Sequence, residues 1–164
     1  MNAANLKPLL LCEPRWTLAV AESLTCGRVQ ARIGAVPGAS EYFLGGVTAY
    51  AMEKKVKLLG VDRAAAATVN AVSAEVAEQM ARGVCELFGA EVGAATTGYA
   101  EPNAARKVAQ PFAWWAVARR EGARFVVRSG RVDCPGVTRV DVQERVAEAV
   151  IVSLVAFLRE ARGA

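Results

Sequence analysis

The sequence predicts an α/β fold, a three-layer α/β/α sandwich with a mixed sheet. Short apolar runs that suit buried strands alternate with longer segments whose apolar residues recur at helical spacing. The last two expected strands are joined by only three residues, EGA, so they must run antiparallel, whereas helices separate the earlier ones. A length of 164 residues suffices for a sizeable core, and we expect one domain over 1–164.

The first fifty residues predict two helices and two strands. An amphipathic pattern over 3–12, followed by a proline, indicates a short helix. The apolar run 16–21 (WTLAVA) is typical of a buried strand, and 25–34 predicts a helix. The stretch 36–46, rich in glycine and proline, predicts turns that lead into a strand over 46–50.

The middle of the chain is mostly helical. Residues 51–59 predict one to two helical turns that Gly60 stops, and 62–70 predict a second short helix. The clearest helix covers 73–89, with a serine at its start, glutamates near the positive end of its dipole and a glycine at its end. A buried strand over 91–100 follows it.

The last third predicts two strands and a long helix. A loop with two prolines, 101–111, precedes strands over 112–120 and 124–132. Residues 137–161 carry apolar side chains at helical spacing, and a threonine near their start would cap this helix.

Histidine is absent from the sequence, which excludes histidine general bases, histidine-containing triads and histidine-ligated metals. Proton transfer would therefore fall to Lys, Tyr, Asp, Glu or Cys. The four cysteines form no CxxC pair, which argues against a zinc or thioredoxin-like site, and we expect free and mostly buried thiols. We also expect no metal and no cofactor. The net charge of +4 is spread along the chain without a basic block. That distribution suits a small anionic substrate and gives no support to nucleic-acid binding.

No apolar stretch reaches the roughly 20 residues that a bilayer-spanning helix needs, and the N-terminus makes a poor signal peptide. We therefore expect a cytoplasmic protein that does not bind membranes. The apolar share of the sequence, 54% of residues, permits a dimer.

The connection AESLTCG (21–27) has the composition of a site rather than of a plain turn. It places a carboxylate, two hydroxyls, a thiol and a glycine between a buried strand and a helix. Ser23 or Thr25 could cap that helix, whose free N–H groups would also attract an anion such as phosphate. Capping accounts for one hydroxyl, but not for Glu22, Ser23, Thr25 and Gly27 together.

Four stretches could meet at the carboxyl end of the sheet, where α/β folds usually bind ligands. They are 21–27, 48–55, 96–103 and 136–145. In the second stretch, Tyr50 and Lys55 flank a strand-to-helix junction. A lysine near a helix start is unfavourable for the dipole, which suggests a task, although a solvated lysine is the plainer alternative.

Segments in this order and spacing match a known family. AESLTCG resembles Ala-Glu-Ser-Cys-Thr-Gly-Gly, and 36–61 resembles the Pro-Gly-Ser-Ser, Gly-Gly-Val and Tyr-Ser-Asn-Glu-x-Lys segments. AVSAEVAEQMARG (71–83) resembles Ala-Val-Ser-Glu-Glu-Val-Ala, and TTGYAEPN (96–103) resembles Thr-Gly-Ile-Ala-Gly-Pro-Asp. The sequence thus resembles the CinA C-terminal domain family, the nicotinamide mononucleotide deamidases, from about residue 16 to 120, with a looser fit to the end.

The resemblance implies an oligomeric amidohydrolase, here a homo-oligomer such as a dimer, that converts the nicotinamide carboxamide to the acid and ammonia. A serine activated by a lysine would act without a metal. The matching catalytic positions are Ser23, Lys55 and Tyr50. The expected substrate-binding residues are Glu22, Thr25, Gly27, Thr97, Gly98, Glu101, Trp114 and Arg139, the last of which fits loosely an arginine that would face the phosphate.

Such a mechanism makes two physical demands. Lys55 can act as a base only if burial or nearby positive charge lowers its pKa from about 10.4 toward neutrality. Ser23 Oγ and Lys55 Nζ should lie about 3 Å apart. Backbone N–H groups at 23–27 or at Gly98 could stabilise the developing oxyanion.

Departures from the family pattern cluster at this site. Leu24 replaces a cysteine, Cys26 a glycine and Met52 an asparagine. Glu101 replaces a glycine, and its carboxylate would repel a phosphate unless it recognises a hydroxyl or a cationic ring instead. Trp114 replaces a threonine; it could narrow the pocket, or it could face the core while the next tryptophan faces the other side of the sheet.

Three hypotheses remain open. The first is an amidohydrolase acting on nicotinamide mononucleotide or a close relative. The second is a module of the same fold that has lost catalysis and binds a nucleotide or serves as a scaffold. The third is amide hydrolysis on an altered substrate.

Overall fold

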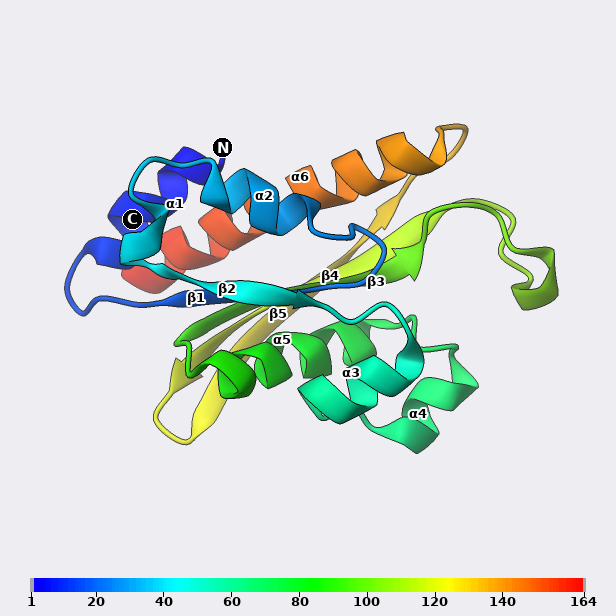
Figure 1. Cartoon of the computed structure of the whole chain (residues 1–164), viewed down its shortest axis with the longest axis horizontal. Helices are drawn as coiled ribbons and strands as arrows, with labels where there is room; N and C mark the ends of the chain where they lie inside the picture. The colour runs from blue at the N-terminus through cyan, green and yellow to red at the C-terminus, as the bar shows by residue number, and fades with distance from the viewer. Residues whose placement is uncertain (1, 164) are drawn as a thin grey trace.

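The computed structural model describes residues 2–163, in which five strands form one mixed sheet between two helical layers (Figure 1). The strands are β1 (Leu18–Glu22), β2 (Phe43–Thr48), β3 (Val92–Tyr99), β4 (Phe112–Glu121) and β5 (Arg124–Asp133). Their order across the sheet is β2-β1-β3-β4-β5. The pairs β1–β2 and β1–β3 are parallel, whereas β3–β4 and β4–β5 are antiparallel. The expected α/β class and mixed sheet are confirmed.

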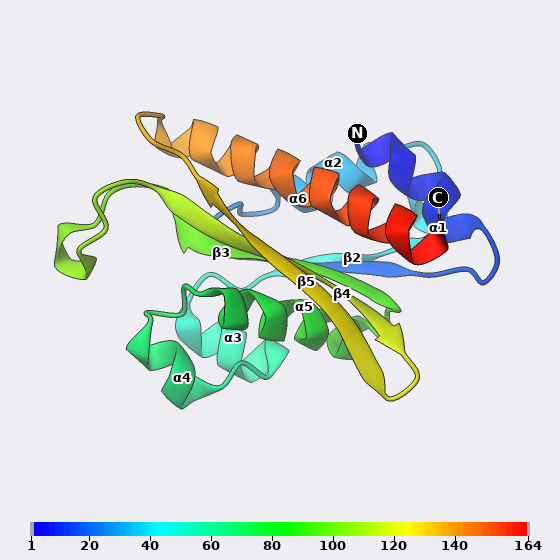
Figure 2. The ribbon, with the colours of Figure 1, turned by 180° about the vertical axis from the view of Figure 1, so that it is seen from behind.

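Six α-helices of the described chain cover the two faces of this sheet (Figures 1 and 2). One layer contains α1 (Leu6–Leu11), α2 (Arg28–Gly34) and α6 (Arg139–Arg162). The other contains α3 (Met52–Leu59), α4 (Arg63–Thr68) and α5 (Ala74–Phe88). Short 3₁₀ turns occur at η1 (Ala3–Asn5), η2 (Ala39–Glu41) and η3 (Ala104–Arg106). None of the described helices combines the length and apolar character that crossing a membrane requires.

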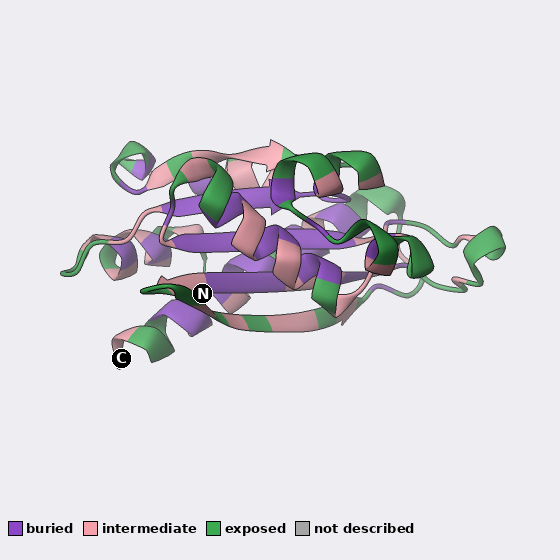
Figure 3. Ribbon diagram, turned by 90° about the horizontal axis from the view of Figure 1, so that it is seen from below, coloured by how far each residue is buried: buried purple, intermediate pink, exposed green. Residues whose placement is uncertain are grey.

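The side chains of strand β1 pack into two hydrophobic clusters, one on each face of the sheet. Leu18 and Val20 pack into the cluster beneath α1, α2 and α6, whereas Ala19 and Ala21 pack into the cluster on the α3–α5 side. This alternation follows from the two-residue period of a strand, and burial on both faces explains the continuous apolar run. Figure 3 shows the buried residues concentrated along the central strands and on the sides of the helices that face the sheet.

Three expected helix boundaries hold at their cap residues, whereas the helix expected over 25–34 begins only at Arg28. Ser73 caps α5 by accepting a hydrogen bond from Val76 N, and Gly60 ends α3 with a φ of 64°. Thr138 caps α6 by accepting a hydrogen bond from Asp141 N. These caps satisfy backbone groups that the helix itself leaves unpaired.

Other expectations need correction. The second strand begins at Phe43, not at residue 46, because two glycines that resemble turn residues lie within it. Gly46 lies within β2, and a Cβ there would lie 2.5 Å from Val20 O, so the close approach of the neighbouring strand requires a glycine at this position. The helix expected over 62–70 ends at Thr68. The four cysteines are free as expected, but only two are buried: Cys85 and Cys134 are buried, and Cys12 and Cys26 are exposed.

Gly83 sets the distance between α5 and the end of α3, the helix that carries Lys55. A Cβ at Gly83 would lie 2.0 Å from Leu59 O and 2.6 Å from Leu59 C. Since backbone atoms cannot step aside as a side chain can, we expect Gly83→Ala to lower the free energy of unfolding by roughly 1–3 kcal/mol. Urea unfolding followed by circular dichroism measures this change.

Gly34→Ala is the control, because a Cβ at this last residue of α2 meets nothing within 4 Å. Alanine there should leave stability unchanged or raise it, by less than about 1 kcal/mol. Equal effects of the two substitutions would contradict close packing at Gly83.

Candidate functional site

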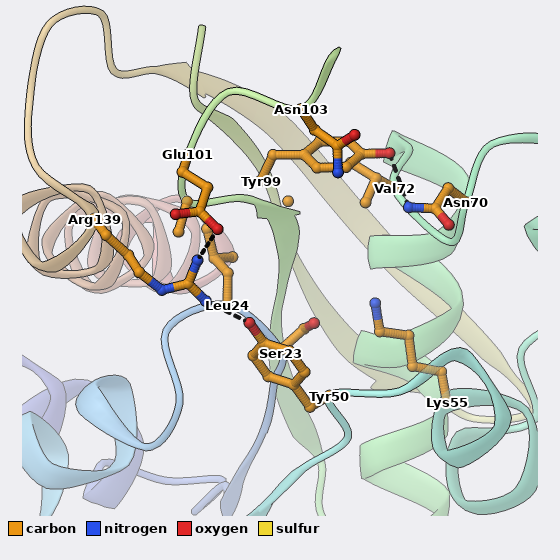
Figure 4. A pocket seen from close by; sticks show the side chains of 12 residues that line it. Ser23, Leu24, Tyr50, Lys55, Asn70, Val72, Tyr99, Glu101, Asn103 and Arg139 are labelled. Carbon is orange, nitrogen blue, oxygen red and sulfur yellow. Dashed lines mark hydrogen bonds and ion pairs between the residues drawn. The ribbon is translucent and has the colours of Figure 1, made fainter. Parts of the chain in front are cut away.

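A cavity of about 250 Å³ opens where the parallel strands end (Figure 4). All four stretches expected to meet at the carboxyl edge of the sheet contribute to it, as does the segment between α4 and α5. The lining residues are Ser23, Leu24, Tyr50, Lys55, Asn70, Val72, Gly98, Tyr99, Ala100, Glu101, Asn103 and Arg139. The loop between β3 and β4, which carries Glu101 near its base, extends away from the body of the molecule (Figure 1).

Ser23 immediately follows β1 and is held by β3. Its backbone N–H donates to Thr96 O at 3.1 Å, with a longer contact of 3.4 Å to Thr96 Oγ1. The chain then turns tightly, because Cys26 N donates to Ser23 O and Cys26 has a φ of 54°. Within 23–27 the N–H groups of Leu24 and Thr25 have no acceptor among the described residues, whereas those of Ser23, Cys26 and Gly27 do.

Lys55 lies one turn into α3 and is only 3% exposed. Its amine donates to Thr97 Oγ1 at 2.8 Å and to Ala71 O at 3.2 Å, and Thr97 Oγ1 in turn donates to Ala71 O at 2.7 Å. Burial lowers the pKa of the Lys55 amine from 10.5 to about 8, because the charged form loses its hydration. The amine is therefore uncharged in a substantial fraction of molecules just above neutral pH.

Figure 4 shows the Ser23 hydroxyl and the Lys55 amine turned into the same cavity. Among the described residues, however, no hydrogen bond joins Ser23 Oγ to Lys55 Nζ, so the expected direct contact of about 3 Å is not formed. The reason is that the amine is held by Thr97 and Ala71. Catalytic hydrogen bonds are often loose without a ligand and tighten when one binds.

The carbonyl that receives Lys55 comes from a strained turn before α5. Asn70 and Ala71 have φ values of 52° and 55°, a conformation that costs a non-glycine residue about 1–3 kcal/mol. Asn70 Nδ2 donates to Tyr99 OH at 3.0 Å, which fastens this turn to the end of β3. This turn places Ala71 O 3.2 Å from the buried Lys55 amine.

Three residues form a chain across the mouth of the cavity. Arg139, the first residue of α6, pairs with Glu101 through Nη1 and Oε1 at 2.9 Å, and its Nη2 donates to Tyr50 OH at 2.7 Å (Figure 4). Tyr50 follows β2, and Glu101 follows β3. The mouth therefore ties together the β2–α3 connection, the extended loop and the start of α6.

The Glu22 side chain was expected to bind substrate, but it points toward the start of α2. Its buried carboxylate accepts hydrogen bonds from Gly27 N, Val29 N, Gln30 N and Gln30 Nε2, at 2.9–3.2 Å. The start of α2 is thus capped by Glu22, and the expectations of a Ser23 or Thr25 cap and of an open anion site there are wrong. A carboxylate at the positive end of a helix satisfies free N–H groups and the dipole together.

We expect Glu22→Gln to lower the free energy of unfolding by roughly 2–3 kcal/mol, because an amide N–H would then face N–H donors in a buried position. Thermal or urea unfolding measures the loss. Glu41→Gln is the control, since Glu41 is an exposed carboxylate paired with Lys7, and exposed pairs contribute little. A Glu22→Gln protein as stable as the wild type would contradict the capping role.

Several other residues expected at the site do not line the cavity. Thr25 is buried and hydrogen-bonded to Thr96, and Gly27 is the N-cap of α2. Thr97 lies behind Lys55 and holds its amine. Trp114 packs with the core on the α3–α5 side while Trp115 packs on the opposite face, so Trp114 does not narrow the cavity. Gly98, Glu101 and Arg139 do line it.

Sequence reasoning missed Asn70 and Tyr99, which line the cavity, and Ala71, whose carbonyl accepts a hydrogen bond from Lys55. Asparagine tolerates a left-handed conformation, so Asn70 after a short helix was an available signal. A left-handed alanine gives no such signal. The role of Tyr99 depends on the contact with Asn70, which is 29 residues away.

Known proteins resemble this chain in sequence and in structure. The CinA C-terminal domain model matches residues 3–158. A CinA-like protein of Chlorobium limicola is 36% identical over 156 residues, which are 94% of this chain and 36% of that protein. A CinA-like protein of Gemmatimonas aurantiaca is 40% identical over 146 residues, 88% of this chain and 33% of that protein. The chain thus spans about a third of the length of these relatives.

Solved structures share the fold. A competence-damaged protein (CinA) superfamily protein from Klebsiella pneumoniae superposes with a TM-score of 0.84 at 24% identity, over 96% of each chain. A competence/damage-inducible protein from Agrobacterium tumefaciens gives a TM-score of 0.77 at 23% identity, over 93% of this chain and 92% of that chain. Because the family model matches nearly the whole length of this chain, the chain belongs to the CinA C-terminal domain family.

Proposed function

We propose that the protein is an amidohydrolase that removes the carboxamide nitrogen of nicotinamide mononucleotide or a close relative, giving the acid and ammonia. The observation that supports this most directly is the buried Lys55 amine, with a pKa lowered to about 8, in the same cavity as the Ser23 hydroxyl. A serine hydroxyl becomes an effective nucleophile when a neighbouring base takes its proton.

The contacts of Lys55 suit a base. An uncharged amine keeps two N–H groups and one lone pair. The two N–H groups match the two acceptors, Thr97 Oγ1 and Ala71 O, so the lone pair stays available for the proton of Ser23. Thr97 and Ala71 thereby act as positioning residues.

The proposed reaction has two halves. Ser23 Oγ attacks the carboxamide carbon as its proton passes to Lys55, and the carbonyl oxygen becomes an oxyanion. The unpaired N–H group of Leu24, a residue that lines the cavity, would donate to that oxyanion. Lys55 then returns the proton to the leaving nitrogen and ammonia departs. Water, giving its proton to Lys55, next attacks the Ser23 ester, and the carboxylic acid is released as Ser23 regains its hydrogen.

The test is ammonia release from nicotinamide mononucleotide by the purified protein, with the acid product identified by chromatography. Stoichiometric ammonia and acid would support the proposal. Ligand binding with no product would favour the second hypothesis, a nucleotide-binding module, for which the absence of a Ser23–Lys55 hydrogen bond is the relevant observation.

A further inference from the structure

The charged side chains that line the cavity indicate which ligand charges the site favours. The charged side chains among the described lining residues are Lys55, Glu101 and Arg139. Arg139 and Glu101 form an ion pair, and Tyr50 OH accepts a hydrogen bond from Nη2 of the same guanidinium. Lys55 is buried and its donors are directed at Thr97 and Ala71. The cavity therefore offers no cation that is both exposed and uncompensated.

A phosphate entering this mouth would meet the Glu101 carboxylate beside Arg139, which is the only exposed cation among the described residues that line the cavity. It would have to displace Glu101 from Arg139 or lie next to it, and either event weakens binding because like charges repel across a short distance. A cationic ring without a phosphate would instead be attracted by the Glu101 carboxylate, because the two charges have opposite signs. No described residue donates a hydrogen bond to Glu101 Oε2, so this carboxylate oxygen can still accept a contact from a positively charged group.

We propose that Glu101 makes this site select a pyridinium carboxamide that lacks a phosphate, such as the nicotinamide nucleoside, over the corresponding nucleotide. The inference rests on the proposed function in that it takes the carboxamide as the reacting group. Glu101 is here a specificity-determining residue, and Arg139 is the group that it neutralises.

Binding tests this independently of turnover. Dissociation constants for nicotinamide mononucleotide and for nicotinamide riboside are measured by titration calorimetry in a Ser23→Ala background, so that neither ligand is consumed, with the wild-type Glu101 and with Glu101→Gln. The protein with the wild-type Glu101 should bind the riboside more tightly. Glu101→Gln, which frees one positive charge at the mouth, should tighten the mononucleotide about tenfold relative to the riboside.

Glu160→Gln is the matched control. Glu160 also pairs with an arginine, Arg128, and its side chain is 64% exposed against 63% for Glu101, but it lies near the far end of α6. This control should leave both dissociation constants unchanged.

Three results would overturn the inference: tighter binding of the mononucleotide by the wild type, an unchanged affinity ratio in Glu101→Gln, or no measurable binding of either compound. Ammonia release distinguishes this failure from failure of the proposed function. If the wild type binds the riboside preferentially but releases no ammonia, the proposed specificity holds and the proposed hydrolysis fails. If the wild type hydrolyses the mononucleotide in preference to the riboside, the proposed hydrolysis holds and the proposed specificity fails.

Discussion

Ser23→Ala should reduce ammonia release by roughly 10³-fold or more while ligand affinity stays within a few-fold of the wild type. The substitution removes only the attacking oxygen, because the contacts that fix this residue are made by its backbone N–H and C=O. Initial rates from a coupled ammonia assay, together with calorimetric affinities, measure the two effects separately.

Ser40→Ala provides the control, since Ser40 is an exposed residue of η2 outside the cavity. It should retain wild-type rates. A Ser23→Ala protein that still hydrolyses the amide at a comparable rate would remove Ser23 as the nucleophile. Loss of both activity and the cooperative unfolding transition would instead point to a folding defect, which the unfolding curve detects.

Lys55→Met should abolish hydrolysis and, at pH 7, make the folded protein more stable. The folded-state pKa of Lys55 is about 8, whereas its ordinary value is 10.5. Below pH 8 the folded state holds a buried charge, which costs roughly 3 kcal/mol relative to the unfolded chain. Methionine fills a similar space without that charge, and Thr97 Oγ1 still donates to Ala71 O.

The sign of the pH dependence follows from proton binding. Between pH 8 and 10.5 the unfolded chain binds the Lys55 proton more tightly than the folded chain does, so the contribution of Lys55 to the free energy of unfolding rises with pH across this interval. The stability advantage of Lys55→Met should therefore be largest below pH 8 and shrink as pH rises toward 10.5. For the same reason, wild-type kcat/KM should rise with pH and level off above about 8.

Lys54→Met is the control on the same helix, because Lys54 is exposed. It should change neither the rate nor the pH dependence of stability. Urea unfolding at several pH values and the pH–rate profile check both parts. A Lys55→Met protein that remains active, or a stability difference that does not vary with pH, would contradict the role assigned to this amine.

The sequence predicted most of the architecture because buried strands and capped helices leave local signals. The run that became β1 was recognisable from its continuous apolar character, and α5 from Ser73 and its apolar stripe. β2 was misplaced by three residues because glycines favour turns in a sequence but also permit close approach between a strand and its neighbours.

The site was predicted less completely, for a physical reason. Motif matches led to Ser23, Tyr50, Lys55 and Arg139, all of which line one cavity. Composition alone cannot tell which way a side chain points, so Glu22, next in sequence to Ser23, was expected in the cavity although it turns toward α2.

The cavity is assembled from both sides of the sheet: Lys55 arrives on a helix of one layer, and Arg139 on a helix of the other. The distance between the Lys55 amine and the Arg139 guanidinium therefore depends on how both helical layers pack against the sheet. We therefore expect substitutions in the packing between these helices and the sheet to change the geometry of the cavity without altering any residue that lines it.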